Sequence, residues 1–550
     1  MIRRAANLLV FAFGGVLVWL LLRIALEKGF SLDEFQYAHA AWLVAVGKLP
    51  YRDFFEVHFP LVYLLGSPVF WFAGSDPAAI WMLRWLMLPF ALLTCAAVGL
   101  LNRHLRSAAA LLGPLFLIAT SDWTTLATEI RPDALGAALF LAALAAIRLP
   151  VGERARCFAA GVLFAWSAAS AQKAAFYGGL TFVCAILLDR RTLPRPLMFG
   201  AGAACGAVPI VWALTGEGMA GAFLEWAVLW GAEHQRQYPG FSWTREVTPI
   251  LIKSPLLVPL AAVGLIDTIR KRNDTTLVAA LGFTFLSAAL QTAPFRYSFL
   301  ATLAMVAVFA ARGVACLFEM RGHPAARTAV VAVAVVAAGA TLISGAHALH
   351  ARLDNHNRHQ LETLEAIGRL LGPRDVAYDN SGSFVARPHV DFYFYTDKYL
   401  RLARARELEA ELPRKLVESG CVLRLKDARE AELPATVRDF LEVHYQPWSG
   451  DLSLWGQRYV ATDTASPLEA LFLAPREGAY FVDPPHVAIE GHLALDGRRV
   501  TSEPVHLTRG EKTLRYVGPP RTFHVLWLPA DGQRWTPKRD EPRRFSRIFY

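Results

Sequence analysis

Apolar runs of about 17–25 residues recur along this chain, and each is long enough to cross a lipid bilayer as a helix. Composition agrees, because 54% of the 550 residues are hydrophobic and the mean hydropathy is +0.33. The sequence therefore predicts a polytopic α-helical membrane protein. We expect eleven spans, near 8–26, 78–101, 107–121, 132–148, 157–171, 174–189, 197–214, 250–269, 275–292, 295–318 and 327–348.

Basic residues concentrate in every second loop between these runs. Positive charge marks the cytoplasmic side of a membrane protein, so the N-terminus is expected inside. The loops 27–77 and 215–249 and everything after about residue 349 are then outside. The same loops explain much of the formal net charge of +10, so no nucleic-acid partner is expected. The basic loops carry Arg3/Arg4, Arg103/Arg106, Arg148/Arg154/Arg156, Arg190/Arg191/Arg195, Arg270/Lys271/Arg272 and Arg312/Arg321/Arg327.

The N-terminal run resembles a signal peptide, but no small-x-small cleavage site precedes Asp33 and more spans follow. We therefore expect it to be retained as the first span. Of the six cysteines only Cys421 lies in the exported tail, so no exported disulfide is predicted. Arginine-rich inner loops with such a tail are typical of a bacterial inner (cytoplasmic) membrane protein with a periplasmic C-terminal region.

Three domains are expected: a transmembrane domain over 1–348, an extracytoplasmic α/β region over 349–474, and a small extracytoplasmic β module over 475–550. Helices are predicted over 350–371 and 401–418, and strands over 479–482, 487–490, 492–495, 513–517 and 523–527. Asp496-Gly497 is a strong hairpin signal. In the first outer loop, residues 33–46 have the apolar spacing of a short surface helix.

Asp33 and Glu34 are adjacent carboxylates just past the first apolar run. Ionised groups close to hydrocarbon lose solvation, which costs free energy, so residues of this kind usually have a function. Asp33 is the predicted catalytic base, which would deprotonate an acceptor, and Glu34 would orient it or help to bind a metal. The alternative is structural, because aspartate is a common N-cap and Glu34 could cap or solvate the helix.

Other polar residues are also expected at the outer ends of spans, where they would line one cavity. Lys173 and Arg296 are predicted to bind a phosphate, although snorkelling to the headgroups is an alternative for both. A divalent metal remains open, but no zinc-type spacing, Walker loop or GxGxxG motif is present. The further candidates for substrate or phosphate binding are Asp53, Glu56, His58, Glu129, Arg131, Asp133 and Tyr297, with Glu233, His234 and Arg236 as weaker ones.

These motifs resemble those of the GT-C glycosyltransferases, in the branch of the protein O-mannosyltransferases, the aminoarabinose transferase of lipid A and the rhizobial lipopolysaccharide glycosyltransferases. The matching text is Asp33-Glu34-Phe35-Gln36-Tyr37-Ala38, then residues 47–53 (GKLPYRD), residues 58–63 (HFPLVY) and Arg131-Pro132-Asp133. The match by topology covers about residues 8–348. Where the aminoarabinose transferase pattern has Glu-Lys-Pro-Pro-Leu, this chain has His58-Phe59-Pro60-Leu61, so His58 stands at the lysine position.

The resemblance implies an inverting transferase that moves a sugar from a polyprenyl-phosphate donor to a glycolipid, glycan or protein acceptor at the outer face of the membrane. It also implies that Asp33 is the base. Two other readings stay open. A transporter or flippase of lipid-linked saccharides would also need a charged cavity, although we see no internal repeat. A non-catalytic anchor for a carbohydrate-binding β module would explain the tail but not the polar cavity.

Overall fold

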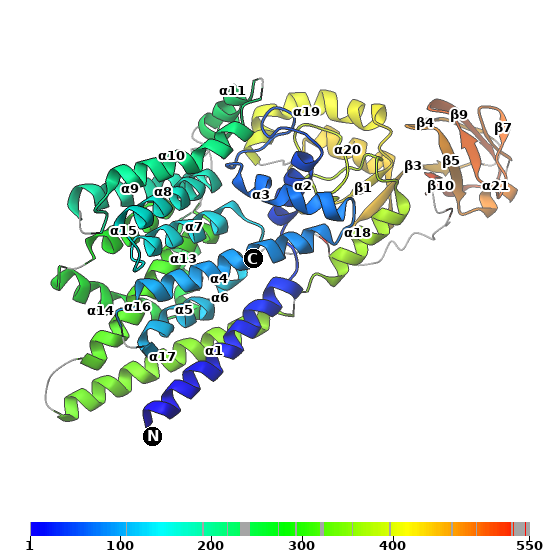
Figure 1. The fold of residues 1–550 in the computed structure, drawn as a ribbon. Helices are drawn as coiled ribbons and strands as arrows, with labels where there is room; N and C mark the ends of the chain where they lie inside the picture. The colour runs from blue at the N-terminus through cyan, green and yellow to red at the C-terminus, as the bar shows by residue number, and fades with distance from the viewer. Residues whose placement is uncertain are drawn as a thin grey trace.

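The computed structural model describes residues 2–105, 107–189, 192–216, 218–230, 242–272, 274–291, 294–319, 324–354, 356–394, 398–463, 466–490, 492–529, 532 and 545. Helices of the first 352 residues form a bundle, and a C-terminal region stands at one end of it (Figure 1). The bundle helices are α1 (Ile2–Glu27), α4 (Ala79–Leu101), α5 (Ser107–Ala119), α6 (Ser121–Ala127), α7 (Pro132–Ala146), α8 (Glu153–Ser170), α9 (Gln172–Leu188), α10 (Pro196–Ala213), α13 (Trp243–Lys253), α14 (Leu257–Arg270), α15 (Thr275–Ala289), α16 (Leu300–Glu319) and α17 (Pro324–Arg352).

Ten of the eleven expected spans coincide each mainly with one of these helices, and the span expected over 250–269 covers the end of α13 and most of α14. Among the residues that the structure describes, five helices are long and apolar enough to cross a membrane, and two bent pairs raise this number to seven. The bends are 77° between α5 and α6 and 100° between α13 and α14. Four of the other expected spans coincide with helices shorter than 18 residues or with α8, whose first turns are charged. The chain is a multi-pass membrane protein, as the hydropathy predicted.

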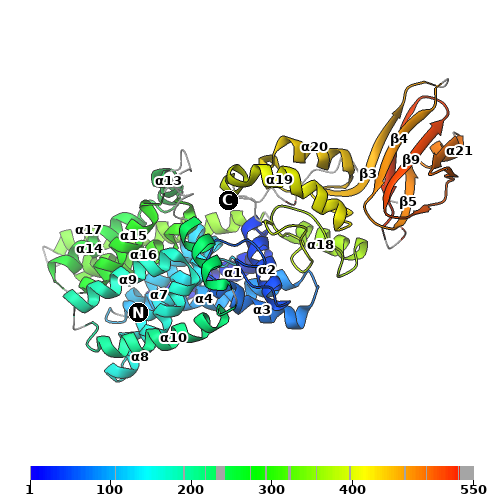
Figure 2. The ribbon, with the colours of Figure 1, turned by 90° about the horizontal axis from the view of Figure 1, so that it is seen from above.

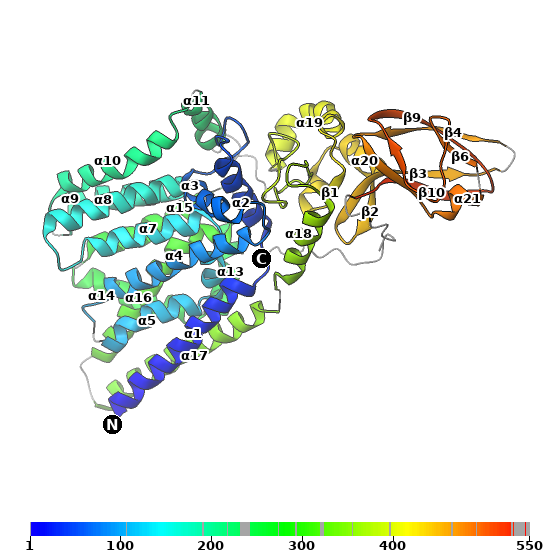
Figure 3. The ribbon, with the colours of Figure 1, turned by 45° about the vertical axis from the view of Figure 1, so that its right-hand side comes forward.

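Small residues let some of the helices approach closely, as is common in membrane bundles. A Cβ atom built on Gly161 of α8 would lie 2.1 Å from the carbonyl oxygen of Phe199 in α10. A Cβ atom on Gly202 of α10 would lie 2.0 Å from the carbonyl oxygen of Phe158 in α8. The two backbones therefore touch at reciprocal glycines, and Figure 3 shows α8 and α10 in neighbouring layers of the bundle.

Two helices of the first loop, α2 (Leu32–Ala45) and α3 (Leu61–Ala73), lie at the end of the bundle beside the C-terminal region (Figure 3). The helix predicted over 33–46 is confirmed as α2, but most of its residues are buried, so it does not have the exposed face of a surface helix. Its N-cap is Ser31, which forms a capping box with Glu34, so Asp33 is not the cap. It ends before Gly47, whose φ of +85° suits glycine. We call this end of the bundle the site end and the opposite end the far end. The π-helix η1 (Leu224–Trp230) follows the short helix α11 (Met219–Phe223) near the site end.

The C-terminal region begins as an α/β unit. Helices α18 (Arg358–Leu370), α19 (Lys398–Glu418) and α20 (Ala435–His444) surround a small sheet in which Tyr378 pairs in parallel with Arg424 of β1 (Leu423–Leu425). The 3-10 helix η4 (Ala428–Glu432) follows β1. Strand β3 (Leu452–Ala461) pairs with β1 and with β2 (Tyr445–Ser449).

A β module follows the α/β unit, and Figure 2 shows it farthest from the bundle. Strand β10 pairs with the second half of β3, so one strand belongs to both units. Strand β4 ends at the residue before the expected boundary of 474/475, yet it pairs with β9 of the module. The strands are β4 (Leu468–Ala474), β5 (Gly478–Asp483), β6 (His492–Leu495), β7 (Arg498–Arg499), β8 (Val505–Leu507), β9 (Gly510–Val517) and β10 (Arg521–Trp527), in the orders β1-β3-β10-β5-β8 and β4-β9-β6-β7.

The strand predicted over 487–490 is wrong, because these residues form the short helix α21 (His486–Glu490). Two prolines precede it, and proline with its fixed φ favours the first turn of a helix. The predicted strands over 479–482, 492–495, 513–517 and 523–527 are confirmed within β5, β6, β9 and β10. All six cysteines are free.

The α/β unit is docked firmly on the first loop. The amide of Phe30 and its carbonyl both bond to the side chain of Gln360, at 2.7 and 2.9 Å. The amide of Phe55 donates to the carbonyl of Phe392 at 2.9 Å. The His39 ring bonds the carbonyl of Val385 at 2.6 Å. Hydrogen bonds at three points across the interface, each with a backbone group on at least one side, fix how the unit sits relative to α2.

Candidate functional site

The Asp33 carboxylate lies between two arginines that come from different parts of the chain. Arg131 donates to its Oδ2 at 3.0 Å, and Arg429 of η4 donates to its Oδ1 at 2.7 Å. The side chain of Asp33 is 20% exposed, so it remains within reach of a ligand. Burial would raise the pKa of the Asp33 carboxyl, but Arg131 and Arg429 outweigh burial and hold that pKa below its ordinary value. Asp33 is therefore a carboxylate held in a fixed orientation.

Arg131 is itself held in place by a buried carboxylate. It is fully buried at the N-cap of α7, and its Nε donates to Glu129 at 2.5 Å. Glu129 also bonds the buried ammonium of Lys28. The fold therefore brings five side chains together in a row of alternating charge: Lys28, Glu129, Arg131, Asp33 and Arg429. Glu129 is 1% exposed, so it supports Arg131 and does not line an open cavity.

Glu34 points away from Asp33. It is completely buried, and both of its oxygens accept from Arg84 of α4 at 2.6 Å. Its Oε2 also accepts from the backbone N–H of Ser31 at 3.0 Å to complete the capping box. Among the described residues no hydrogen bond joins Glu34 to Asp33, and the enclosed, bidentate carboxylate of Glu34 has no free surface for a metal. The placement therefore does not favour the predicted role of orienting Asp33 or binding a metal. It agrees with the structural alternative.

His58 lies close to Asp33 and is held by two partners. Its Nδ1 is 2.7 Å from Glu56, a fully buried carboxylate that also accepts from the backbone amides of Val57 and His58. Its Nε2 is 3.3 Å from the hydroxyl of Tyr37. The His58 side chain is 20% exposed. Glu56 thus acts as the support and His58 as the group that can meet a ligand.

Lys173 stands on the other side of Arg131, and the ring of Tyr297 lies between them. The Arg131 guanidinium is 4.6 Å and the Lys173 ammonium 4.7 Å from the ring centroid. Lys173 also donates to Asp133 at 2.8 Å and to Ser298 at 3.0 Å. The structure therefore places Lys173, Asp133, Tyr297 and Arg131 in one contiguous group.

Arg296 belongs to an adjoining group of cations. It precedes Tyr297 in the short 3-10 helix η3 (Arg296–Phe299) and faces the buried Asp122 at 3.4 Å. Asp122 also accepts from Lys253 and Arg352, at 3.0 and 3.3 Å. Glu246 lies 3.4 Å from Arg296. These side chains give three cations against two carboxylates, and the cations are 21–31% exposed.

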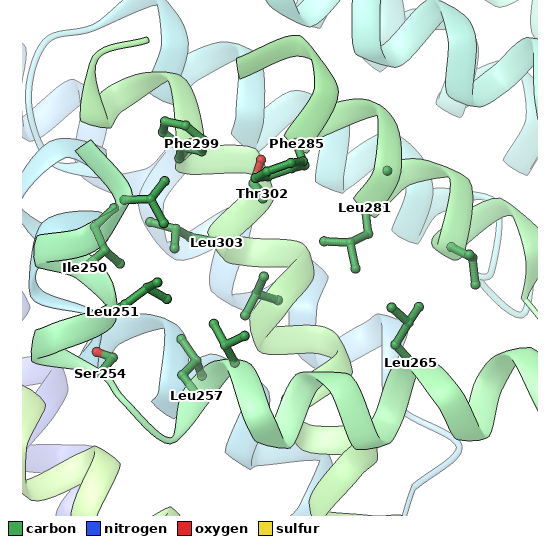
Figure 4. A pocket seen from close by; sticks show the side chains of 15 residues that line it. Ile250, Leu251, Ser254, Leu257, Leu265, Leu281, Phe285, Phe299, Thr302 and Leu303 are labelled. Carbon is green, nitrogen blue, oxygen red and sulfur yellow. The ribbon is translucent and has the colours of Figure 1, made fainter. Parts of the chain in front are cut away.

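An apolar cavity of about 500 Å³ opens beside this second group. It lies between α13, α14, α15 and α16, and Figure 4 shows leucine, isoleucine and phenylalanine side chains turned into it. Phe299 of η3 lines one end of the cavity, and Ser254, next to Lys253, lines another part. The single turn η3 thus joins three parts of the site. Phe299 lines the apolar cavity, Arg296 pairs with Asp122, and Tyr297 lies beside Arg131, the partner of Asp33.

Asp53 lies apart from the residues around Asp33. It closes its own turn by accepting from the amide of Leu49 at 2.8 Å and from Arg52, and it contacts none of the described side chains around Asp33. Glu233, His234 and Arg236 lie outside the described residues. Among the residues that the structure describes, no three histidine, cysteine or acidic side chains lie together as a metal site. The donor set at Asp33 does not fit a metal centre, because both carboxylate oxygens bind arginines.

The residues of this site that were missed from the sequence are Lys28, Lys253, Arg352, Arg84 and Arg429. Arg429 is 396 positions from Asp33 in a stretch of charged helical text, and nothing local distinguishes it. Arg84 had a usable signal, because a single arginine stands inside an otherwise apolar span and such residues almost always have a buried partner.

Comparison with solved structures reveals similar folds. The chain superposes on ArnT from Cupriavidus metallidurans bound to undecaprenyl phosphate with a TM-score of 0.57 and 13% identity, covering 81% of this chain and 97% of ArnT. The oligosaccharyltransferase AglB from Archaeoglobus fulgidus, in complex with an inhibitory peptide and a dolichol-phosphate, gives a TM-score of 0.50 and 13% identity over 76% of this chain and 70% of AglB.

A second structure of the Archaeoglobus fulgidus oligosaccharyltransferase, tethered to an acceptor peptide, gives a TM-score of 0.51 and 13% identity over 80% of this chain and 72% of that one. No protein-family model and no curated protein sequence matches the chain. At these identities the likeness concerns architecture. The chain therefore has the fold of these membrane glycosyltransferases, as the motifs of its first loop predicted.

Proposed function

We propose that this protein is an inverting membrane glycosyltransferase that uses a sugar linked to a polyprenyl phosphate. The observation that carries the proposal is the continuity from the apolar cavity, through the cations around η3, to the Asp33 carboxylate. A lipid-linked donor needs these three parts in this order: a place for a chain, a place for a phosphate and a group that receives a proton. The shared fold with proteins whose structures hold undecaprenyl phosphate and dolichol-phosphate supports the same reading.

The reacting group is Asp33. A hydroxyl or amine of the acceptor attacks the anomeric carbon of the donor sugar and transfers its proton to the Asp33 carboxylate. The bond from the anomeric carbon to the phosphate oxygen breaks on the opposite face, so the configuration inverts. Its electron pair stays on the phosphate, and the carrier leaves as polyprenyl phosphate. Because Arg131 and Arg429 fix both carboxylate oxygens, Asp33 does not have to be oriented during the reaction.

The phosphate is bound by the cations nearest to η3. Lys173 and Arg296 retain their predicted role, and Lys253 joins them from α13. These cations stabilise the charge that gathers on the leaving phosphate. The polyprenyl chain occupies the apolar cavity, which opens among helices that would face the bilayer. His58, held by Glu56, contacts the donor or the acceptor close to Asp33.

The site end is the outer face of the membrane in this proposal. The basic loops that the charge rule places inside, among them those of Arg103 and Arg148, lie at the far end of α4 and α7, away from Arg84 and Arg131. The α/β unit and β module are then extracytoplasmic, in the periplasm of a bacterial inner membrane. Acceptors of the expected classes, a glycolipid, a glycan or a protein, would reach Asp33 from that side.

The test uses purified protein in nanodiscs with radiolabelled polyprenyl-phosphate sugars and a membrane glycolipid extract. Wild type is compared with Asp33→Asn and with the control Asp76→Asn, which removes an exposed carboxylate from the same loop. We expect label to move to a new product with wild type and Asp76→Asn but not with Asp33→Asn. A fully active Asp33→Asn would contradict the role of Asp33 as base. Label that crosses the bilayer unchanged, equally in all three proteins, would replace the transferase by a flippase.

A further inference from the structure

A second concave site lies at the far end of the bundle. It is a cavity of about 400 Å³ at the ends of α4 and α7, and it also includes residues from the start of α8 and from the loops before α10 and α15. Helix α4 has 23 residues, which at 1.5 Å per residue separates this cavity from the Arg84 end by roughly 34 Å. It therefore shares no residue with the site around Asp33.

The lining is rich in arginine. Arg103, Arg148 and Arg156 point to the cavity together with the imidazole of His104, and the one carboxylate among the lining residues is Asp274. That carboxylate is already neutralised, since Arg148 and the buried Arg312 both contact it at 2.7 Å.

Two of the lining arginines form no close ion pair among the described residues, so they can bind an anionic ligand. Arg156 has only a long 3.8 Å contact with the half-exposed Glu153. Arg103 is exposed and has no ion pair among the described residues. The local potential is positive enough to affect His104: partial burial and the charges of Arg312, Arg148 and Lys271 lower its pKa, against the opposing effect of Asp274. An anion is therefore the ligand that this cavity suits.

The same cavity has an apolar side. Leu100, Leu101 and Ile147, which are the last residues of two apolar helices, line it, and Leu100 is 39% exposed. The arginines and the apolar side chains thus meet where a membrane helix ends, which is the depth of lipid headgroups. Basic pockets between membrane helices are known to bind anionic headgroups. A mixed lining of this kind suits a phosphate that carries an acyl chain beside it.

We propose that this cavity binds the phosphate of an anionic lipid headgroup at the face opposite Asp33. Arg103 and Arg156 donate to the phosphate oxygens, and Arg148, held by Asp274, forms the wall of the site. The acyl chains of the lipid lie along the exposed side of Leu100. The inference does not depend on the transferase reaction.

The test measures phosphate binding directly. The full chain is reconstituted in phosphatidylcholine nanodiscs with and without phosphatidylglycerol, and lipid retained after detergent extraction is measured by native mass spectrometry. The test variant carries both Arg103→Gln and Arg156→Gln. The control is Arg270→Gln, which removes an exposed arginine at the C-terminal end of α14, outside the cavity. A separate arm adds inorganic phosphate to protein in phosphatidylcholine alone and follows thermal unfolding.

We expect wild type and Arg270→Gln to retain phosphatidylglycerol, and the double variant to bind it about 25-fold more weakly, from about a 5-fold loss per arginine. Stabilisation by inorganic phosphate that the double variant loses would identify a free phosphate as sufficient, and it would support the same site. Equal retention in all three proteins, with no response to phosphate, would overturn the proposal and leave only a generally basic surface. A correctly folded double variant is verified by its unchanged unfolding temperature in phosphatidylcholine.

Discussion

Replacing Arg429 by glutamine tests whether the C-terminal region takes part in the reaction. The change removes one of the two guanidinium groups that bind Asp33 and leaves Arg131 in place. The Arg429 and Asp33 side chains are 12% and 20% exposed. Their pair is therefore intermediate between exposed pairs, worth about 0–1 kcal/mol, and buried ones, where loss of a partner costs about 3–5 kcal/mol. We take about 2 kcal/mol as the expected energy of the contact on this scale.

If Asp33 must keep its orientation as the transition state forms, that energy lowers kcat/KM by about 30-fold, since 1.36 kcal/mol is a factor of ten. The pH profile carries a second signature. Arg429 helps to hold the Asp33 pKa below its ordinary value, so the carboxylate stays ionised until the pH falls through that low pKa. Without Arg429 the pKa rises, and the acid limb of kcat/KM moves to higher pH.

The assay is the nanodisc transfer reaction, followed from acid to neutral pH. Arg429→Lys should restore part of the rate because it keeps a positive charge, and Arg438→Gln, an exposed arginine of the neighbouring α20, should behave as wild type. An unchanged rate and acid limb in Arg429→Gln would refute the reasoning. A faster reaction would also refute the reasoning, because Arg429 would then inhibit the reaction at Asp33.

Three other changes probe the supports of the site. Arg84→Gln leaves the buried Glu34 without its bidentate partner and should cost about 3–5 kcal/mol, seen as a lower unfolding temperature in detergent; an unchanged temperature would argue against the pair. Gly382→Ala adds a methyl 2.8 Å from the Cβ of His39 at a φ of +67° and should expose the docked α/β unit to limited proteolysis. Gly497→Ala, with a φ of +71° and open space around it, is its control, and equal proteolysis would contradict the docking argument. Leu303→Trp fills the apolar cavity and should weaken polyprenyl-phosphate binding by at least about tenfold. The control Val335→Trp, on the exposed face of α17, should leave binding unchanged. Equal binding by the two variants would place the lipid elsewhere.

The positions of the membrane helices could be predicted because hydrophobic length and loop charge are local properties. The cluster around Asp33 was partly foreseeable for the same reason: Asp33, Arg131 and Lys173 each stand at the outer end of a predicted span, so topology alone placed them on one side. Which of them touch could not be predicted. The separate group of Arg296 and Asp122 depends on the bend between α5 and α6, and a bend of this kind leaves no mark on hydropathy.

Glu34 and Arg429 show a second limit. Asp33 and Glu34 are neighbours with the same carboxylate chemistry. Only the rotation of α2 decides that Asp33 faces Arg131 and Glu34 faces Arg84. Arg429 reaches Asp33 because the α/β unit docks through Gln360, His39 and Phe392, contacts between segments hundreds of residues apart. Long-range docking of this kind cannot be read from one sequence.

Strand β3 gives the β module a mechanical link to the Asp33 carboxylate. Its first half is hydrogen-bonded to β1, its second half to β10, and η4 with Arg429 follows directly after β1. A strand that belongs to both units transmits force along its backbone more directly than a flexible linker does. Tension or a bulky ligand on the β module would therefore be felt at η4, and a single inserted residue within β3 would shift every side chain beyond it to the other face.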